Sequence, residues 1–112
     1  MGSNGGALTE AVYYILLTLL RPRHGYGIMQ TVEGLTGGRV RLAAGTLYGA
    51  ISTMLDKGWI TALPGEGEGR RKEYLITAEG MSVLREELAR LEELASNGKT
   101  LLEERENEGN LL

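Results

Sequence analysis

The sequence predicts a small, mainly helical α+β domain that ends in a long helix. In the first half of the chain, apolar residues recur every three or four positions, which is the spacing of helices that pack on a core. The period then changes to two on either side of a glycine-rich segment, as expected for a β-hairpin. Beyond the hairpin, an apolar stripe with heptad spacing indicates a helix that packs along another helix.

Length and composition favour one globular domain. The chain has 112 residues, of which 42% are hydrophobic and 24% are charged, and this length provides one modest core. It contains no cysteine and a single histidine, His24, which excludes disulfide scaffolds, thiolate zinc sites and histidine-rich metal clusters. It also lacks a nucleophile–base pair and a P-loop. We therefore expect no enzyme activity, no catalytic residues, no metal and no cofactor.

The sequence shows no sign of membrane insertion or export. The longest apolar stretch, residues 12–20, is interrupted by Thr18 and is far shorter than the roughly 20 residues that a spanning helix needs. No segment has the pattern of a signal peptide. We expect a soluble, cytoplasmic protein with no membrane partner, in which the glycine-rich residues 1–6 are a disordered leader or an expression remnant.

Two helices are expected before the middle of the chain. The first begins near Thr9, a good N-cap residue, and Pro22 ends it. The second follows a short turn at residues 24–27 and stops at Gly37-Gly38. We expect His24 to be an exposed turn residue and the ring of Tyr26 to cover the edge of the core. The apolar face of these helices comprises Val12, Ile15, Leu16, Leu19, Leu20, Ile28, Met29, Val32 and Leu35.

A third helix begins near Ala44 or Gly45, after a short extended piece around Arg41, and closes at Lys57-Gly58. Its buried stripe is expected to contain Leu47, Ile51, Met54 and Leu55. The opposite face is small and polar apart from one ring, so it has little reason to be buried. That face carries Thr46, Tyr48, Gly49, Ser52 and Thr53. The sequence leaves open whether Tyr48 donates to a phosphate or packs over the first helix.

Residues 59–63 and 71–77 are the expected strands of the hairpin, joined by the glycine-rich turn at 64–69. A last helix opens at Thr77 and runs to about residue 106, with a weak point at Asn97-Gly98 where it either ends or softens. Residues 107–112 are expected to form a disordered tail. The paired carboxylates Glu86-Glu87 are expected to belong to a solvated face.

A helix over residues 78–106 would be about 40 Å long, more than a domain with a radius of gyration of about 13 Å can cover. An apolar stripe on an overhanging helix needs another chain, so we expect a homodimer. The candidate dimerisation residues are Leu8, Leu84, Leu88, Leu91, Ala95 and Leu102.

Three helices followed by a hairpin are the order of a winged helix-turn-helix, which we assign to residues 7–77. The small outer face of the third helix would allow close approach to the major groove of double-stranded DNA. Residues 1–77 contain eight Lys and Arg against six Asp and Glu, whereas residues 78–112 contain four against nine. Arg39 and the basic residues among the candidates given next would neutralise phosphates. The candidate DNA-binding residues are Arg41, Thr46, Tyr48, Gly49, Ser52, Thr53, Arg70, Arg71 and Lys72.

Several short motifs, in a fixed order, resemble one family. These are Gly25-Tyr26-Gly27-Ile28, Gly45-Thr46-Leu47-Tyr48, Gly58-Trp59-Ile60, and Arg70-Arg71-Lys72-Glu73-Tyr74 followed by Leu75 to Gly80. Over residues 8–106 the chain resembles the PadR family of transcriptional regulators, in its short subgroup. The resemblance implies a dimeric DNA-binding repressor whose last helix makes much of the dimer contact. It also implies release by a small hydrophobic or aromatic effector.

A second function of a different class stays open. The third helix is poor in cations, the net charge is −3, and Glu66 and Glu68 in the hairpin turn would repel phosphate. These features are also typical of a winged-helix module with little DNA affinity that serves in protein interaction or as a small-molecule sensor.

Overall fold

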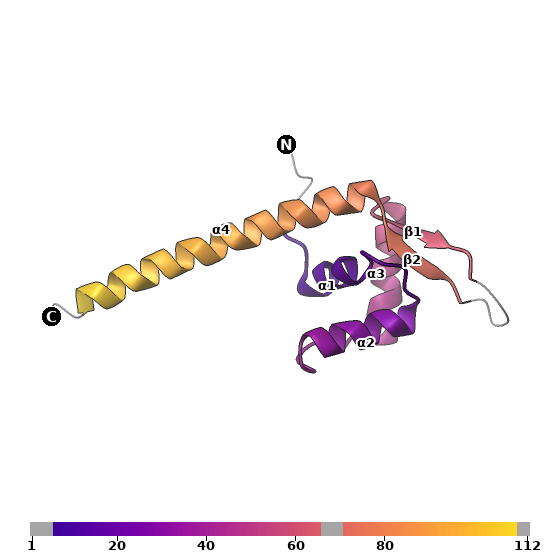
Figure 1. Ribbon diagram of the computed structural model, residues 1–112, viewed down its shortest axis with the longest axis horizontal. Coiled ribbons are helices and arrows are strands. Elements are labelled where there is room, and N and C mark those ends of the chain that lie inside the picture. Colours follow the sequence, from indigo (N-terminus) through magenta and orange to yellow (C-terminus); the bar gives the residue numbers. More distant parts are fainter. Residues whose placement is uncertain (1–5, 66–70, 110–112) are drawn as a thin grey trace.

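The protein has two visible parts, a helical unit with a hairpin at one side and a long helix that projects away from it (Figure 1). The computed structural model describes residues 6–65 and 71–109. The elements along the chain are α1 (Glu10–Thr18), α2 (Gly25–Leu35), α3 (Ala44–Asp56), β1 (Ile60–Leu63), β2 (Glu73–Ile76) and α4 (Ala78–Gly109). The expected fold class, a mainly helical α+β winged helix-turn-helix, is confirmed.

Side-chain caps set where the first two helices begin. The hydroxyl of Thr9 accepts the N–H of Val12 at 3.1 Å, which fixes the start of α1 as the sequence predicts. Nδ1 of His24 accepts the N–H of Gly27 at 3.2 Å. The expected turn over residues 24–27 is therefore wrong, because these residues form the cap and first turn of α2. The first turn of a helix leaves backbone N–H groups without a partner, and the His24 side chain satisfies one of them. His24 is therefore an N-cap residue and not a free turn residue.

Helix α1 ends at Thr18, four residues before the proline that was expected to stop it. Nε of Arg23 donates to the carbonyl of Thr18 at 2.8 Å, so this side chain satisfies one of the free carbonyls at the helix end. Leu20 lies beyond the helix and no longer follows its periodicity. Its side chain is consequently 47% exposed, and its expected place in the core is wrong.

The core lies between α1, α2 and α3 and extends to the hairpin and the start of α4. Its buried members are Ile15, Leu16, Leu19, Ile28, Val32, Leu47, Ile51, Met54, Ile60, Tyr74 and Leu84. Leu35 and Leu55 were expected here but are exposed, because each stands at or next to a helix end, past the contact with the neighbouring helices. Tyr26 is also exposed and covers no core edge. Ile28, on the other side of the same helical turn, occupies that position.

The hairpin is shorter than the sequence predicts, since each strand has four residues. β1 pairs antiparallel with β2, with Ile60 opposite Ile76 and Leu63 opposite Glu73. The segment between α1 and α2 adds a third short pairing, because Tyr74 donates its N–H to the carbonyl of Arg23 at 2.8 Å and accepts the N–H of Arg23 at 3.2 Å. This pairing ties the hairpin to the helical unit.

Helix α4 begins against the hairpin and the end of α3. The hydroxyl of Thr77 accepts the N–H of Gly80 at 3.0 Å and donates to the carbonyl of Gly58 at 2.6 Å. Gly58 has a φ of 77°, a left-handed conformation that glycine adopts without strain. A Cβ atom on Gly80 would lie only 2.1 Å from the carbonyl oxygen of Trp59. The close approach of α4 to Trp59 therefore requires glycine at this position.

Helix α4 runs without a break through residues 96–98 and ends at Gly109. Residues 107–109, expected to belong to a disordered tail, are helical, whereas 110–112 lie outside the described residues, as do 1–5 of the expected leader. The projecting helix gives the molecule extents of 69 × 35 × 21 Å and a radius of gyration of 17.9 Å, above the roughly 13 Å typical of this length. None of the helices in the described part combines the length and apolar character needed to span a membrane.

A buried carboxylate joins α4 to the start of the chain. Glu87 is only 5% exposed, so its expected place on a solvated face is wrong. Nε and Nη2 of Arg90 donate to its two oxygens at 2.8 and 2.6 Å, and the N–H of Leu8 donates to Oε2 at 3.3 Å. These hydrogen bonds compensate for burial of the charge, and those from Arg90 foremost hold the pKa of Glu87 below its usual range.

Replacing Gly80 by alanine is expected to lower the free energy of unfolding by about 1–3 kcal/mol, because the new methyl group would collide with the backbone of Trp59. Gly34 is the matched control, since a Cβ there meets no atom within 4 Å. Gly34→Ala is expected to stabilise the protein by about 0.5–1 kcal/mol. Urea unfolding at fixed protein concentration measures both, and equal effects at the two positions would contradict the close approach.

Replacing Glu87 by glutamine is expected to cost about 1–3 kcal/mol of unfolding free energy at neutral pH. Because folding lowers the pKa of this carboxyl, its contribution is complete above the ordinary glutamate pKa of about 4.3 and is lost as pH falls through the folded-state pKa. The difference between wild type and Glu87→Gln should therefore vanish in acid. Urea unfolding across pH tests this, with exposed Glu86→Gln as control. A difference independent of pH would refute the ionised contact.

Candidate nucleic-acid interface

The outer face of α3 is open to solvent and carries small side chains. Thr46, Gly49, Ser52 and Thr53 are all exposed, and the Thr53 hydroxyl donates to the carbonyl of Gly49 at 3.2 Å. The structure thus places these four expected DNA-binding residues on the exposed side of one helix. The only charged residue of α3 is Asp56 at its last position, so this face offers hydroxyl groups and backbone rather than cations.

Tyr48 lies against α2, which neither alternative from the sequence anticipated. A Cβ on Gly25 would stand 2.2 Å from the Tyr48 hydroxyl oxygen, so the ring rests on the first turn of α2 and not over α1. The side chain is nevertheless 49% exposed. Tyr48 therefore packs on α2 with one side and leaves the other available to a ligand. Burial, with Tyr48 as a second cause, raises the pKa of Tyr74.

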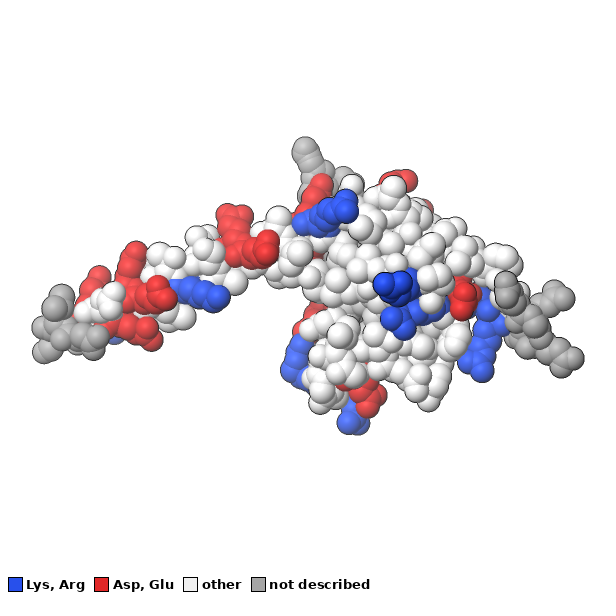
Figure 2. Space-filling model, in the orientation of Figure 1, with Lys and Arg blue, Asp and Glu red and all other residues white. Residues whose placement is uncertain are grey.

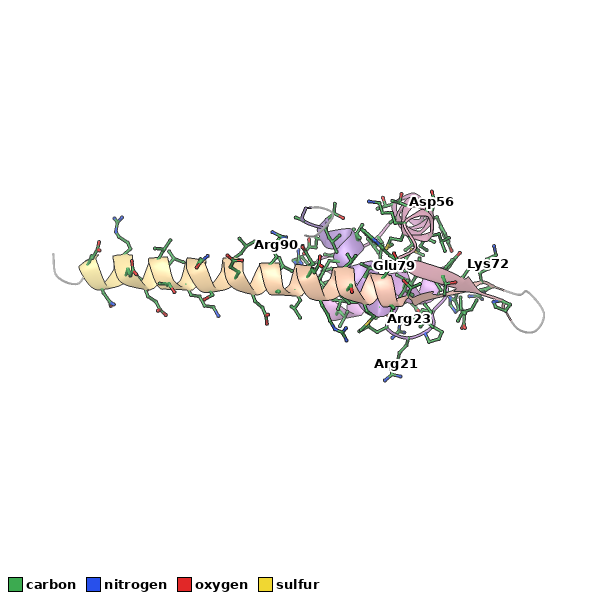
Figure 3. All side chains as sticks on the ribbon, turned by 90° about the horizontal axis from the view of Figure 1, so that it is seen from above. Arg21, Arg23, Asp56, Lys72, Glu79 and Arg90 are labelled. Atoms are coloured by element: carbon green, nitrogen blue, oxygen red, sulfur yellow. The ribbon has the colours of Figure 1, made fainter. Side chains whose placement is uncertain are left out.

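The described cations expected to meet phosphate lie outside α3, just before β2 and in the loop before the helix. Arg71 and Lys72 are exposed just before β2, and Figure 3 shows Lys72 on the hairpin. Arg41 is exposed in the loop before α3, with Nε 3.8 Å from a carboxylate oxygen of Glu33. Arg70, together with Glu66 and Glu68, falls outside the described residues.

Other arginines point elsewhere. Figure 3 shows Arg21 on the opposite side of the molecule from α3, and Arg23 beside it. In Figure 2, acidic side chains lie along the projecting part of α4. The excess of negative charge is therefore spread along α4, away from the hairpin, and the charge asymmetry of the sequence becomes an asymmetry in space.

Arg39 stands just before α3 but is engaged by a carboxylate. Its Nη1 donates to Oε1 of Glu10 at 3.3 Å, and its Nη2 donates to Oε2 of the same residue. The hydrogen bonds from Arg39 lower the pKa of Glu10. The pair joins the first turn of α1 to the loop between α2 and α3. No local motif signals it, because the two residues are 29 positions apart.

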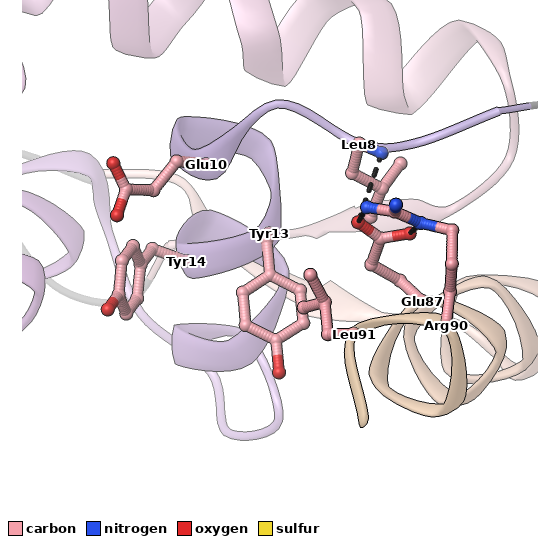
Figure 4. A pocket seen from close by; sticks show the side chains of 7 residues that line it. All are labelled: Leu8, Glu10, Tyr13, Tyr14, Glu87, Arg90 and Leu91. Atoms are coloured by element: carbon pink, nitrogen blue, oxygen red, sulfur yellow. Dashed lines mark hydrogen bonds and ion pairs between the residues drawn. The ribbon is translucent and has the colours of Figure 1, made fainter. Parts of the chain in front are cut away.

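A cavity of about 300 Å³ lies between α1 and α4 (Figure 4). Its lining combines rings and leucines with the Glu87–Arg90 pair and the Glu10 carboxylate: Leu8, Glu10, Tyr13, Tyr14, Glu87, Arg90 and Leu91. The rings of Tyr13 and Tyr14 meet edge to face, with centroids 6.0 Å apart. The structure thus places Tyr13 in this cavity. Glu87 and Arg90 gave no signal in the sequence.

The six expected dimerisation residues are not equally available. Leu84 is 7% exposed and belongs to the core of the domain, and Leu8 and Leu91 line the cavity. Leu88, Ala95 and Leu102 are exposed. The described part of α4 exposes two further leucines, Leu94 at 54% and Leu101 at 64%.

Trp59 has a structural role at the end of α3. Trp59 packs on the core, and Nζ of Lys57 stands 4.8 Å from the centroid of its ring, a cation–π contact at the end of α3. Among the described residues, no group of three or more His, Asp or Glu side chains comes together as a metal ion would require.

Comparison with known proteins agrees with this geometry. A family model described as the transcriptional regulator PadR-like family matches residues 14–86. No curated protein matches the chain. A transcriptional regulator from Clostridium thermocellum is 27% identical with a TM-score of 0.68, and the match covers 82% of this chain and 89% of that one.

Two further solved structures are similar. A PadR family transcriptional regulator from Eggerthella lenta is 29% identical with a TM-score of 0.72, over 82% of this chain and 80% of that one. A PadR-like transcription factor from Bacteroides fragilis is 26% identical with a TM-score of 0.70, over 80% and 87%. With more than half of its length matched by the family model, this chain belongs to the PadR-like family of transcriptional regulators.

Proposed function

We propose that the protein is a homodimeric repressor that binds operator DNA in the cytoplasm through α3 and the hairpin. The observation that carries the proposal is the outer face of α3, which is exposed and built from small side chains within the fold of a regulator family. The repressor role rests on the resemblance to the PadR family, and the cytoplasmic location follows from the DNA partner.

The two parts of the interface would have different tasks. The hydroxyls of Thr46, Ser52 and Thr53 can donate to and accept from base edges, and Gly49 lets the helix approach closely. Since α3 has no cation, attraction to the phosphates would come from Arg41 before the helix and from the basic residues of the hairpin. Such contacts position the protein without reading sequence.

The exposed surface of the projecting helix α4 supports the proposal of a dimer. Residues 92–109 of α4 are exposed along their whole length, and no part of the same protomer covers the exposed leucines there. Positions 95, 98 and 102 continue the heptad spacing of 84, 88 and 91 beyond the domain, and Ala95 and Gly98 there would allow two helices to approach closely. A two-fold pair would place two α3 helices on half-sites about 34 Å apart.

The cavity between α1 and α4 is where we place a small hydrophobic or aromatic effector. Its volume of about 300 Å³ lies at the small end of the range for ligand sites, and the rings of Tyr13 and Tyr14 with Leu8 and Leu91 suit an apolar molecule. Because α4 forms one wall, an occupant would act on the same helix that joins the protomers.

Fluorescence anisotropy with DNA from upstream of the protein's own coding region tests the proposal. The same measurement on a scrambled duplex of equal length, at two salt concentrations, separates specific from general binding. Tighter binding to the upstream fragment at both salts would support operator recognition. Absence of binding to either duplex would refute it and favour the alternative, a winged-helix module for protein interaction or small-molecule sensing.

The double substitution Arg71→Ala/Lys72→Ala is expected to weaken binding to both duplexes alike, because phosphate contacts carry no sequence information. The plot of log affinity against log salt should become shallower by about 0.9 for each lost contact. The matched control is Lys99→Ala/Arg105→Ala, which removes the same charge from the exposed part of α4. Equal losses in the two variants would take the hairpin out of the interface.

The double substitution Leu101→Glu/Leu102→Glu is expected to convert the dimer to a monomer at micromolar concentration, since it places like charges at a buried two-fold contact. Light scattering coupled to size exclusion measures the mass. DNA affinity should fall at least about tenfold, because two linked half-site contacts become one. Leu35→Glu, at an equally exposed leucine on α2, is the control and should remain dimeric. A dimeric Leu101→Glu/Leu102→Glu protein would refute the α4 interface.

A further inference from the structure

The loop before α3 contains Arg39, whose guanidinium group is already paired with the carboxylate of Glu10. We propose that Glu10 withholds Arg39 from DNA, and that its carboxylate competes with a backbone phosphate for the same guanidinium group. The inference rests on the proposed function and deepens it, because it adds to the expected phosphate contact of Arg39 a carboxylate, Glu10, that competes for the same guanidinium group.

The geometry of the pair is that of an arginine bound to an oxyanion. Both Nη atoms of Arg39 donate, one to each oxygen of Glu10. A phosphate is bound by the same planar fork of donors. Glu10 therefore occupies the donors that a phosphate would use, and the two acceptors compete for one guanidinium group.

With α3 in a major groove, as proposed, Arg39 would lie at the border of that groove. Helix α3 begins at Ala44, only five residues further along, and the N-terminal end of a recognition helix is the end that contacts base edges. Gly37 and Gly38 have φ values of 60° and 84°, and the N–H of Arg39 donates to the carbonyl of Thr36 at 3.1 Å. This turn fixes the backbone at residue 39, so only the side chain needs to move.

The pair is weak enough to exchange. The side chains of Arg39 and Glu10 are 61% and 53% exposed, and an exposed ion pair in water is worth only about a two- to fivefold preference. Arg41 and Glu33 offer a contrast, because their closest contact is a single one of 3.8 Å. Arg41 is therefore free to reach phosphate already, whereas Arg39 must first leave its partner.

The affinities of Glu10→Gln, Arg39→Gln and the double variant for a scrambled duplex, over a series of salt concentrations, test the inference. A scrambled duplex suffices because a phosphate contact needs no operator. Glu10→Gln is expected to raise affinity about two- to fivefold for each protomer on the DNA. Its salt dependence should steepen by about 0.9 for each freed arginine. In the Arg39→Gln background this gain should disappear.

Glu92→Gln is the matched control, since it removes one exposed carboxylate of α4 that takes part in none of the ion pairs described above. An equal gain from Glu92→Gln, or a gain from Glu10→Gln that survives in the Arg39→Gln background, would reveal a general charge effect and overturn the inference. No gain from Glu10→Gln would overturn it as well. If wild type binds DNA and depends on Arg71 and Lys72, the proposed function stands in each of these cases, whereas a wild type that binds no DNA overturns both.

Discussion

The contact between Gly80 and the carbonyl of Trp59 is the constraint on which the rest of the molecule depends. It lets the first turn of α4 lie directly on the end of the α3–β1 connection, where Thr77 also bonds to Gly58. These contacts set the direction in which 32 residues of helix leave the domain. Because a helix is stiff over such a length, the direction fixed at residue 80 would decide where the second protomer of the proposed dimer stands. The spacing of the two α3 helices in that dimer would then depend on this one glycine.

Charge is divided between the two parts of the chain in a way that suits DNA binding without a basic recognition helix. A face of hydroxyls and glycine can approach base edges closely but attracts no phosphate from a distance. Attraction must therefore come from residues beside α3, and these include arginines that the fold pairs with carboxylates. A duplex adds a dense row of competing anions, so pairs that are weak in the free protein need not survive in the complex. The acidic residues along α4 stand away from the hairpin and do not enter this competition.

The sequence predicted the order of elements because each element has its own local signal. Periodicity identified three buried positions of α3, Leu47, Ile51 and Met54. Thr9 marked the start of α1, and the glycines marked the hairpin and the end of α3. Errors arose where a contact outside the helical periodicity decides the outcome, whether that contact is local, as between His24 and Gly27, or distant, as between Tyr48 and Gly25. His24 caps α2, Leu20 lies beyond a helix that ends early, and Tyr48 rests on Gly25. None of these follows from spacing alone.

The candidate site also combines residues that the sequence predicts with contacts that only the structure shows. The α3 face and the hairpin cations could be listed from the sequence, since their order along the chain suffices. The Glu10–Arg39 and Glu87–Leu8 contacts span 29 and 79 positions and required the structure. Both carboxylates border the cavity between α1 and α4. One holds the start of the chain against α4, and the other holds the loop that leads into α3. A molecule bound in this cavity would thus lie against the helix proposed to join the protomers and against the carboxylate proposed to restrain Arg39. It could therefore change DNA binding in two ways, by altering the dimer and by altering the Glu10–Arg39 pair.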